Sequence, residues 1–101
     1  MPRIRQATPL ADALAGLIRN LGFEKKLKEQ QLIQRWAEIV GQQIAVHSKA
    51  VHFEGGKLFV EVDSAAWRQE LHFMKAQIAY RLNEASETPM VREIILTNKK
   101  R

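Results

Sequence analysis

Hydrophobic residues in the first forty positions recur at helical spacing, which predicts two helices. The first begins at Thr8 and Pro9, because a hydroxyl can accept a hydrogen bond from an unpaired amide and proline tolerates the first helical position. Gly22 is placed to end this helix. The second helix is predicted from about Leu27 to Val40, with Gly41 at its C-terminus. The apolar positions of the first helix are Leu10, Leu14, Leu17, Ile18 and Leu21.

Between residues 50 and 62 the apolar period changes from helical to two, which predicts a β-hairpin. Gly55 and Gly56 suit a two-residue turn in which both residues have positive φ. This turn places one wholly apolar face on the hairpin and leaves His52, Phe59 and Glu61 on the other face. The expected cross-strand pairs are Glu54 with Lys57, Phe53 with Leu58, His52 with Phe59, and Val51 with Val60.

A long helix and a final strand are predicted after the hairpin. Asp63 or Ser64 can cap a helix from Ala65 to about Asn83, and the β-branched run at 91–96 reads as a strand. A right-handed crossover sets this strand parallel to the second one. The order α-α-β-β-α-β predicts an α+β domain, with a small three-stranded mixed sheet covered on one face by helices. The core stripe of the long helix is Trp67, Leu71, Met74, Ile78 and Leu82.

The length and composition predict one soluble, cytoplasmic domain over residues 1–101, with short basic arms at about 1–7 and 98–101. Hydrophobic residues make up 46% of the chain and charged residues 27%, which is typical of a globular protein. No apolar run approaches the roughly 18 residues of a membrane helix, so no membrane contact is expected. The absence of cysteine excludes disulfides, thiolate catalysis and cysteine-based zinc sites.

The net charge of +5 is concentrated at the two ends of the chain. Without five terminal basic residues, eleven basic and eleven acidic residues remain, so the body is neutral. Basic arms suit a polyanion such as nucleic acid, although they would equally serve only to keep a small protein soluble. One further basic cluster precedes the second helix. The candidate nucleic-acid-binding residues are therefore Arg3, Arg5, Lys25, Lys26, Lys28, Lys99, Lys100 and Arg101.

The sequence predicts no catalytic residue, metal site, cofactor or small-molecule substrate. His47, His52 and His72 match no metal-binding spacing, and no nucleophile elbow, phosphate loop or dinucleotide fingerprint is present. The remaining candidates are surfaces for a partner. Outward-facing His52 and Phe59 suit base stacking or a protein contact, unless neighbouring strands cover them. Phe73 and Tyr80 form a second stripe on the long helix, interpreted as a seat for the first helix in preference to a docking face.

Two patterns carry a resemblance to a known family: WxxIVGxxIAxHS from Trp36 and LxVxVxSxxWxxEL from Leu58. With them, the stretch from about Leu32 to Leu96 resembles the DciA-like family, which is associated with loading the bacterial replicative helicase. The resemblance implies a fold similar to a type II KH domain. The GxxG loop with which KH domains grip single-stranded RNA is missing, since Gly41 is followed by Gln-Gln-Ile.

The resemblance leads to a functional hypothesis: a non-enzymatic adaptor that binds the DnaB-type replicative helicase and assists its loading on DNA at replication initiation. The basic residues add weak, sequence-nonspecific binding to single-stranded or double-stranded DNA. Two alternatives stay open. One is a KH-like RNA-binding protein acting in translation or ribosome assembly, and the other is a pure protein-interaction module. Trp36 and Trp67 lie on predicted buried stripes, so they are expected to support the fold rather than to bind a ligand.

Overall fold

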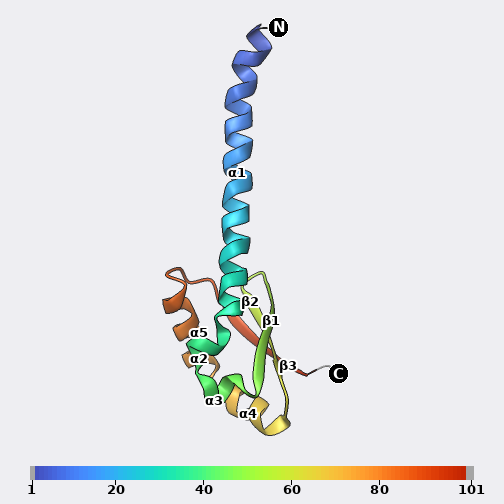
Figure 1. The fold of residues 1–101 in the computed structure, drawn as a ribbon, viewed down its shortest axis with the longest axis vertical. Helices are drawn as coiled ribbons and strands as arrows, with labels where there is room; N and C mark the ends of the chain where they lie inside the picture. The colour runs from blue at the N-terminus through green and yellow to red at the C-terminus, as the bar shows by residue number, and fades with distance from the viewer. Residues whose placement is uncertain (1, 100–101) are drawn as a thin grey trace.

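The computed structural model describes the backbone of residues 2–99 and the side chains of residues 9–99. A long helix extends away from a smaller body formed by the rest of the chain (Figure 1), and the molecule measures 67 × 30 × 18 Å. The side chains of Arg3 and Arg5, and all of Lys100 and Arg101, lie outside the described residues. The helices are α1 (Pro2–Gln34), α2 (Trp36–Val40), α3 (Gln42–Ala45), α4 (Ala65–Phe73) and α5 (Lys75–Ala85). The strands are β1 (Ser48–Glu54), β2 (Lys57–Val62) and β3 (Glu93–Asn98).

The two helices predicted for the first forty residues are largely a single helix, α1. The prediction that Gly22 ends a helix is wrong. Residues 23–34 are rich in Glu, Lys, Leu and Gln, which favour helix, and one internal glycine costs only about 1 kcal/mol, so the helix continues. Pro9 likewise lies inside α1 rather than at its start. The chain leaves helical geometry at Arg35 (φ −93°, ψ 7°), and the short helices α2 and α3 follow on either side of Gly41.

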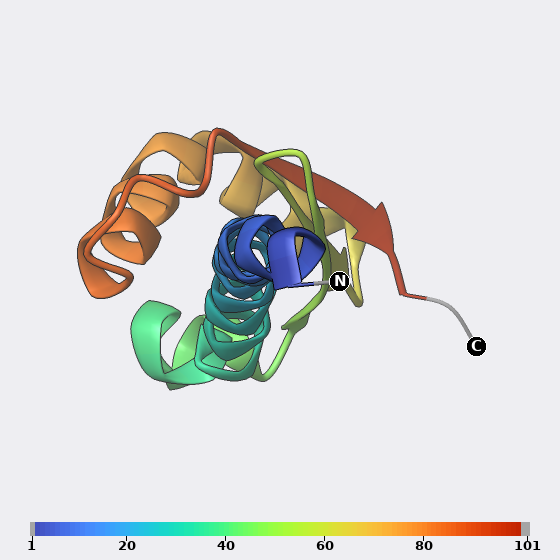
Figure 2. The same ribbon diagram turned by 90° about the horizontal axis from the view of Figure 1, so that it is seen from above.

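The three strands form one open mixed sheet in the order β1-β2-β3, which confirms the predicted α+β class. β1 and β2 are antiparallel, and β3 is parallel to β2 as predicted. Figure 2 looks along α1 and shows the sheet on one side of it, with α2 and α5 on the other. One core fills the space between the sheet and the helices. Its most deeply buried large side chains are Leu32, Leu58, Val60, Val62, Leu71, Ile78 and Leu82.

The hairpin pairs as predicted for the three residue pairs next to its turn. Further along, a β-bulge puts Ala50, rather than Val51, opposite Val60. The extra residue moves Val51 off the inward face, where it is exposed, and the small side chain of Ala50 is buried instead. The prediction of an apolar face that includes Val51 is therefore wrong by one residue.

The long helix predicted after the hairpin is two helices, α4 and α5, separated at Met74. Met74 has φ −101° and ψ 4°, and its N–H donates to the carbonyl of Leu71, three residues back, at 3.0 Å. The break has a tertiary cause, since α4 packs on β2 and β3 whereas α5 packs on α2 and β3. Of the predicted core stripe, Leu71, Ile78 and Leu82 are buried, and Trp67 and Met74 are half-buried.

Two apolar sets lie on the surface. Phe73 and Tyr80, interpreted as a seat for the first helix, are 75% and 66% exposed, so that interpretation is wrong. Its physical reason is that α1 packs on β1 and α2 and leaves the outer side of α4 and α5 uncovered. The second set is the apolar stripe of α1, the five residues from Leu10 to Leu21, with exposed fractions between 55% and 76%.

The hairpin turn is formed by Gly55 and Gly56, whose φ angles are 58° and 82°. A side chain at either position would be strained, because L-residues in this region lose roughly 1 to 2 kcal/mol. Gly56 has a second constraint. A Cβ atom on Gly56 would lie 2.7 Å from Cδ of Arg92, whose backbone N–H donates to the Gly56 carbonyl at 2.7 Å. Gly56 is therefore required by its conformation and by a close neighbour.

Alanine substitutions should separate these two constraints. We expect Gly55→Ala to lower the free energy of unfolding by about 1 to 2 kcal/mol. Gly56→Ala should cost about 1 kcal/mol or more beyond that, because the new methyl group overpacks against Arg92. Chemical denaturation measures both losses. In an Arg92→Ala background the excess should disappear, and equal losses for the two single variants would contradict the steric constraint.

Candidate nucleic-acid and partner surfaces

Three shallow hollows surround the base of α1, where the helix enters the body. They lie between residues 21–35, at the C-terminal end of α1 and just beyond it, and the end of α5 with the loop that joins it to β3. Their volumes are about 180, 240 and 360 Å³. The largest also reaches the Gly55-Gly56 turn, so these hollows join three segments that are distant in the sequence.

Lys25 and Lys28, two of the predicted nucleic-acid contacts, each line two of these hollows and are exposed. Arg92 lines the largest hollow together with Lys25. Arg92 is not among the contacts predicted from the sequence, because it has no basic neighbour in the chain and only the fold brings it to the base of α1. Glu24, Glu29 and Glu87 also line these hollows, so the positive charge of Lys25, Lys28 and Arg92 is partly offset there.

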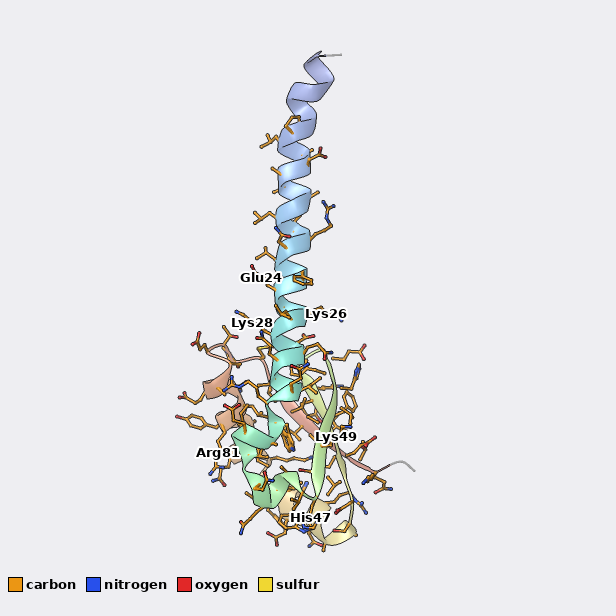
Figure 3. The ribbon with its side chains drawn as sticks, in the orientation of Figure 1. Glu24, Lys26, Lys28, His47, Lys49 and Arg81 are labelled. Atoms are coloured by element: carbon orange, nitrogen blue, oxygen red, sulfur yellow. The ribbon has the colours of Figure 1, made fainter. Side chains whose placement is uncertain are left out.

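Lys26 points elsewhere. Figure 3 shows Lys26 and Lys28 on opposite sides of α1. The hydrogen bond from His52 and the charge of that ring lower the pKa of the Glu54 carboxyl, and the charges of Lys26 and Lys57 lower it further. Lys26 therefore faces the hairpin, and the three lysines predicted as one cluster do not form one patch.

Arg35, which lines the smallest of the three hollows, is engaged within the protein. Its guanidinium makes an ion pair with Glu38 at 3.1 Å and also donates to the carbonyl of Ala85 at 3.4 Å. The hydrogen bond and the charge of this pair raise the pKa of Arg35 and lower that of Glu38. Arg35 consequently holds α1 against the end of α5.

The described part of the C-terminal arm lies at a separate place. The backbone N–H of Lys99 donates to the carbonyl of Val62 at 3.1 Å, just beyond the last residue of β3. Its side chain lines a hollow of about 180 Å³ with Lys49, Glu61 and Asp63, which shares no residue with the hollows at the base of α1. The free end of α1 is the far end of the long axis (Figure 1). The structure thus does not bring the two arms together.

The outer face of the sheet carries the other predicted partner residues. His52 lies opposite Phe59, their rings are 5.4 Å apart at 42°, and the His52 ring also bonds the Glu54 carboxylate at 3.1 Å. Phe59 is half-buried beside Ile95 of β3. The strand registers put three glutamates and two lysines on this face, so a polyanion gains little from it. The charged residues are Lys49, Glu54, Lys57, Glu61 and Glu93.

The residues of the two family patterns support the fold. The Trp36 side chain is buried, and its indole N–H donates to Oγ of Ser48 at 3.0 Å. The Ser48 hydroxyl in turn donates to the carbonyl of Ile44 at 2.6 Å, and this hydrogen bond connects α3 to the start of β1. Ser64 caps α4 by accepting the N–H of Trp67 at 3.2 Å. These contacts confirm a structural role for Trp36 and Ser64.

His47 and Trp67 form a stacked pair at the end of the body opposite to α1 (Figure 3). The two rings are 4.6 Å apart at 18°, and Nδ1 of His47 lies 3.1 Å from Oδ2 of Asp63. Trp67 is half-buried rather than fully buried. It joins the start of α4 to the turn before β1, so its place is intermediate between core and surface.

Metal-binding clusters and membrane-spanning helices are both absent from the part of the chain that the structure describes. Within residues 9–99, whose side chains are described, no three His, Cys, Asp or Glu side chains lie close enough to bind a metal ion together. Over the same range, no helix combines the length and the apolar character needed to cross a membrane.

The fold is an α+β domain with an open three-stranded sheet. The hollows on its surface are shallow rather than enclosed. The chain belongs to the DciA family: residues 9–96 match the sequence profile described as "Dna[CI] antecedent, DciA". It is 31% identical over 96 residues to a UPF0232 protein of Mycobacterium tuberculosis H37Rv, covering 95% of this chain and 51% of the relative. UPF0232 proteins of Mycobacterium leprae and Rhodococcus jostii are 30% and 27% identical over the same shares. The chain spans about half the length of the curated relatives it matches.

Proposed function

We propose that this chain is a non-enzymatic adaptor that binds the DnaB-type replicative helicase and assists its loading on DNA. The observation that carries the proposal is membership of the DciA family over residues 9–96, since this family is associated with helicase loading. The adaptor works in the cytoplasm, and residues 1–101 act as one domain with basic arms. Because it hydrolyses no nucleotide, any loading draws on binding free energy or on the helicase's own hydrolysis.

The order of elements supports a KH-like scaffold. When α1, α2 and α3 are counted as one helical segment, the order of elements is α-β-β-α-α-β. This order resembles the type II KH arrangement. In that arrangement the GxxG loop of an RNA-binding domain joins two helices, and here the α4–α5 junction at Met74 contains no glycine. The scaffold therefore lacks the usual RNA clamp, and we assign it to protein and DNA contacts.

We place the DNA contact of the body at the base of α1, on Lys25, Lys28 and Arg92. These three cations surround adjoining hollows, whereas the outer face of the sheet carries more glutamates than lysines. The contact is electrostatic, because the one aromatic side chain that lines these hollows, Phe53, is buried and not available to stack on a base. Binding without sequence preference follows, since phosphate contacts carry no base information.

Neutralising Lys25 and Lys28 together should weaken DNA binding and its salt dependence. For single-stranded DNA we expect Lys25→Gln with Lys28→Gln to flatten the slope of log affinity against log salt by about 1.4, because each phosphate that is no longer neutralised accounts for about 0.7. Fluorescence anisotropy over a salt series measures this slope. The matched control is Lys26→Gln with Lys57→Gln, which removes the same charge on the hairpin side. A control that flattens the slope equally would assign the effect to net charge.

Helicase binding is tested by a pull-down with the cognate DnaB-type helicase at low salt. A complex at micromolar concentration supports the proposal, and no complex under these conditions contradicts it. Two faces remain candidates for the contact: His52 and Phe59 on the sheet, and Phe73 and Tyr80 on α4 and α5. Because Phe73 and Tyr80 are exposed, changing both to serine should leave the melting temperature unchanged. Loss of the complex in that variant assigns the contact to α4 and α5, and retention excludes that face.

The two alternative functions are separate outcomes of nucleic-acid binding assays. Preference for RNA over DNA of equal length in a competition assay would favour a KH-like RNA-binding protein in translation or ribosome assembly. Absence of nucleic-acid binding at about 50 mM salt, where electrostatic binding is strong, would favour a pure protein-interaction module.

A further inference from the structure

The apolar stripe of α1 continues the helix face that packs on the body. Leu32 lies on that face and is 2% exposed in the core. At 100° per residue, Leu14 has the same direction as Leu32, and Leu21 lies within about 20° of both. The body covers this face only near the C-terminal end of α1. Towards the free end the same face carries Leu10, Leu14, Leu17, Ile18 and Leu21, all exposed, and of the described chain only the loop before β3 comes near this stripe, where Leu21 shares a hollow with Thr88 and Met90.

The stripe is suited to contact with another helix. Between residues 9 and 23 the only charged residues are Asp12 and Arg19, and helical geometry places both on the opposite side from Leu10. Small residues flank the stripe, among them Ala11 and Ala13, which allow close approach of a second helix. A soluble monomer rarely leaves so continuous an apolar surface uncovered. A partner helix could therefore bury the stripe without burying a charge.

The spacing of the leucines identifies the partner. Leu10 and Leu21 lie at equal distances from the midpoint between Ala15 and Gly16, and so do Leu14 and Leu17. A second α1 in antiparallel orientation would set Leu10 against the partner's Leu21 and Leu14 against the partner's Leu17, as a two-fold interface requires. The steps of four, three and four are those of two helices that pack along a common seam. We propose that this stripe is the interface between two copies of this chain, paired antiparallel through α1.

Antiparallel pairing keeps the two bodies apart. Antiparallel pairing carries the two bodies to opposite ends of the helix pair, so they do not compete for space (Figure 1). It also separates the two Lys25 and Lys28 groups from each other, whereas parallel pairing would place them side by side; the same register sets each Lys28 opposite residue 3 of the partner, which is also basic. At roughly 100 Å² for a whole leucine side chain, the five stripe residues of two copies bury about 600 Å². The flanking alanines add to this area, which places the pair among the weak, reversible interfaces.

Self-association is tested by sedimentation equilibrium of the full chain between about 5 and 200 µM, because a weak dimer responds to concentration. We expect the dimer fraction to rise over this range for the unchanged protein. Leu14→Glu with Leu17→Glu should give a monomer at every concentration, with an unchanged melting temperature, because both leucines are exposed outside the body. Arg19→Glu on the opposite side of α1 is the control and should dimerise as the unchanged protein does.

The orientation is tested with single cysteines, since the chain has none of its own. On mixing Leu10→Cys with Leu21→Cys under mild oxidation, antiparallel pairing should give the mixed disulfide. Two copies of Leu10→Cys should not cross-link with each other, because antiparallel pairing separates these positions by about 16 Å along the helix. A disulfide requires Cα atoms within about 7 Å.

Each contrary result overturns the proposal. A protein that stays monomeric at about 200 µM excludes the second copy as the occupant. If that monomer loses its helicase complex on Leu14→Glu with Leu17→Glu, the stripe belongs to the helicase contact instead. Cross-linking of Leu10→Cys with itself, without the mixed product, would show parallel pairing. A dimer that persists in Leu14→Glu with Leu17→Glu would place the interface on another face.

Discussion

Replacement of Trp36 by alanine is expected to lower the free energy of unfolding by about 3 to 5 kcal/mol, which approaches the whole stability of a small domain. Trp36 is only 3% exposed, and its helix α2 packs on α1, β1 and α5. The substitution removes the large aromatic side chain from the core and also the indole N–H that donates to Ser48. Any loss of partner binding would then be indirect. Thermal and chemical denaturation, followed by circular dichroism, measure the effect.

Two further variants define the cause of that loss. Trp36→Phe keeps most of the apolar volume and removes the hydrogen bond to Ser48, so it should cost less than Trp36→Ala. Trp67→Ala should also destabilise the protein, but less, because Trp67 is half-buried and stacks on His47 at the edge of the core. A Trp36→Ala protein that melts like the unchanged protein would contradict the burial of this side chain.

Removal of the two arms is expected to change the salt dependence of DNA binding more than any single substitution. If the five terminal cations each neutralise one phosphate of single-stranded DNA, log affinity falls against log salt with a slope of about −3.5 from these contacts. A chain of residues 6–98 should lose most of that slope. The body should remain folded, because its core begins at Leu32 and ends at Ile94. Anisotropy titrations at several salt concentrations measure the slope.

The truncated chain also separates the two candidate DNA contacts. If it keeps both its DNA affinity and its slope, the arms serve solubility, and the contact lies at Lys25, Lys28 and Arg92. The double variant Lys25→Gln with Lys28→Gln should then flatten the slope in the truncated chain as well. Helicase binding should change little on truncation if it uses the neutral body.

The sequence predicts those parts of the fold that depend on local pattern. Alternation around Gly55 and Gly56 predicts the hairpin and its first pairs, and the strand-helix-strand order predicts the parallel partner of β2. The bulge escapes this reasoning because Ala50 and Val51 are both apolar, so alternation does not reveal which of them faces inward. The helix end predicted at Gly22 is wrong for a related reason. A glycine indicates a helix end only when the residues beyond it do not themselves favour helix.

Features that depend on distant contacts could not be predicted. The break at Met74 carries no local indication, because it arises from the different neighbours of α4 and α5. Phe73 and Tyr80 have the spacing of a packed face, but nothing in their own segment shows that α1 turns away from them. The candidate DNA surface was predicted in part: Lys25 and Lys28 stand out as a local cluster, whereas Arg92 joins them only through the fold.

The length and stiffness of α1 fix a distance between the two ends of the molecule. At 1.5 Å per residue, its 33 residues span about 50 Å. Duplex DNA rises about 3.4 Å per base pair, so this rod matches roughly fifteen base pairs, or more than one helical turn. A flexible tether of the same number of residues would sample many shorter separations. A molecule that binds through both ends of α1 can therefore make both contacts at once only where the two sites on the target are about 50 Å apart. On a target with another spacing, it makes only one contact at a time.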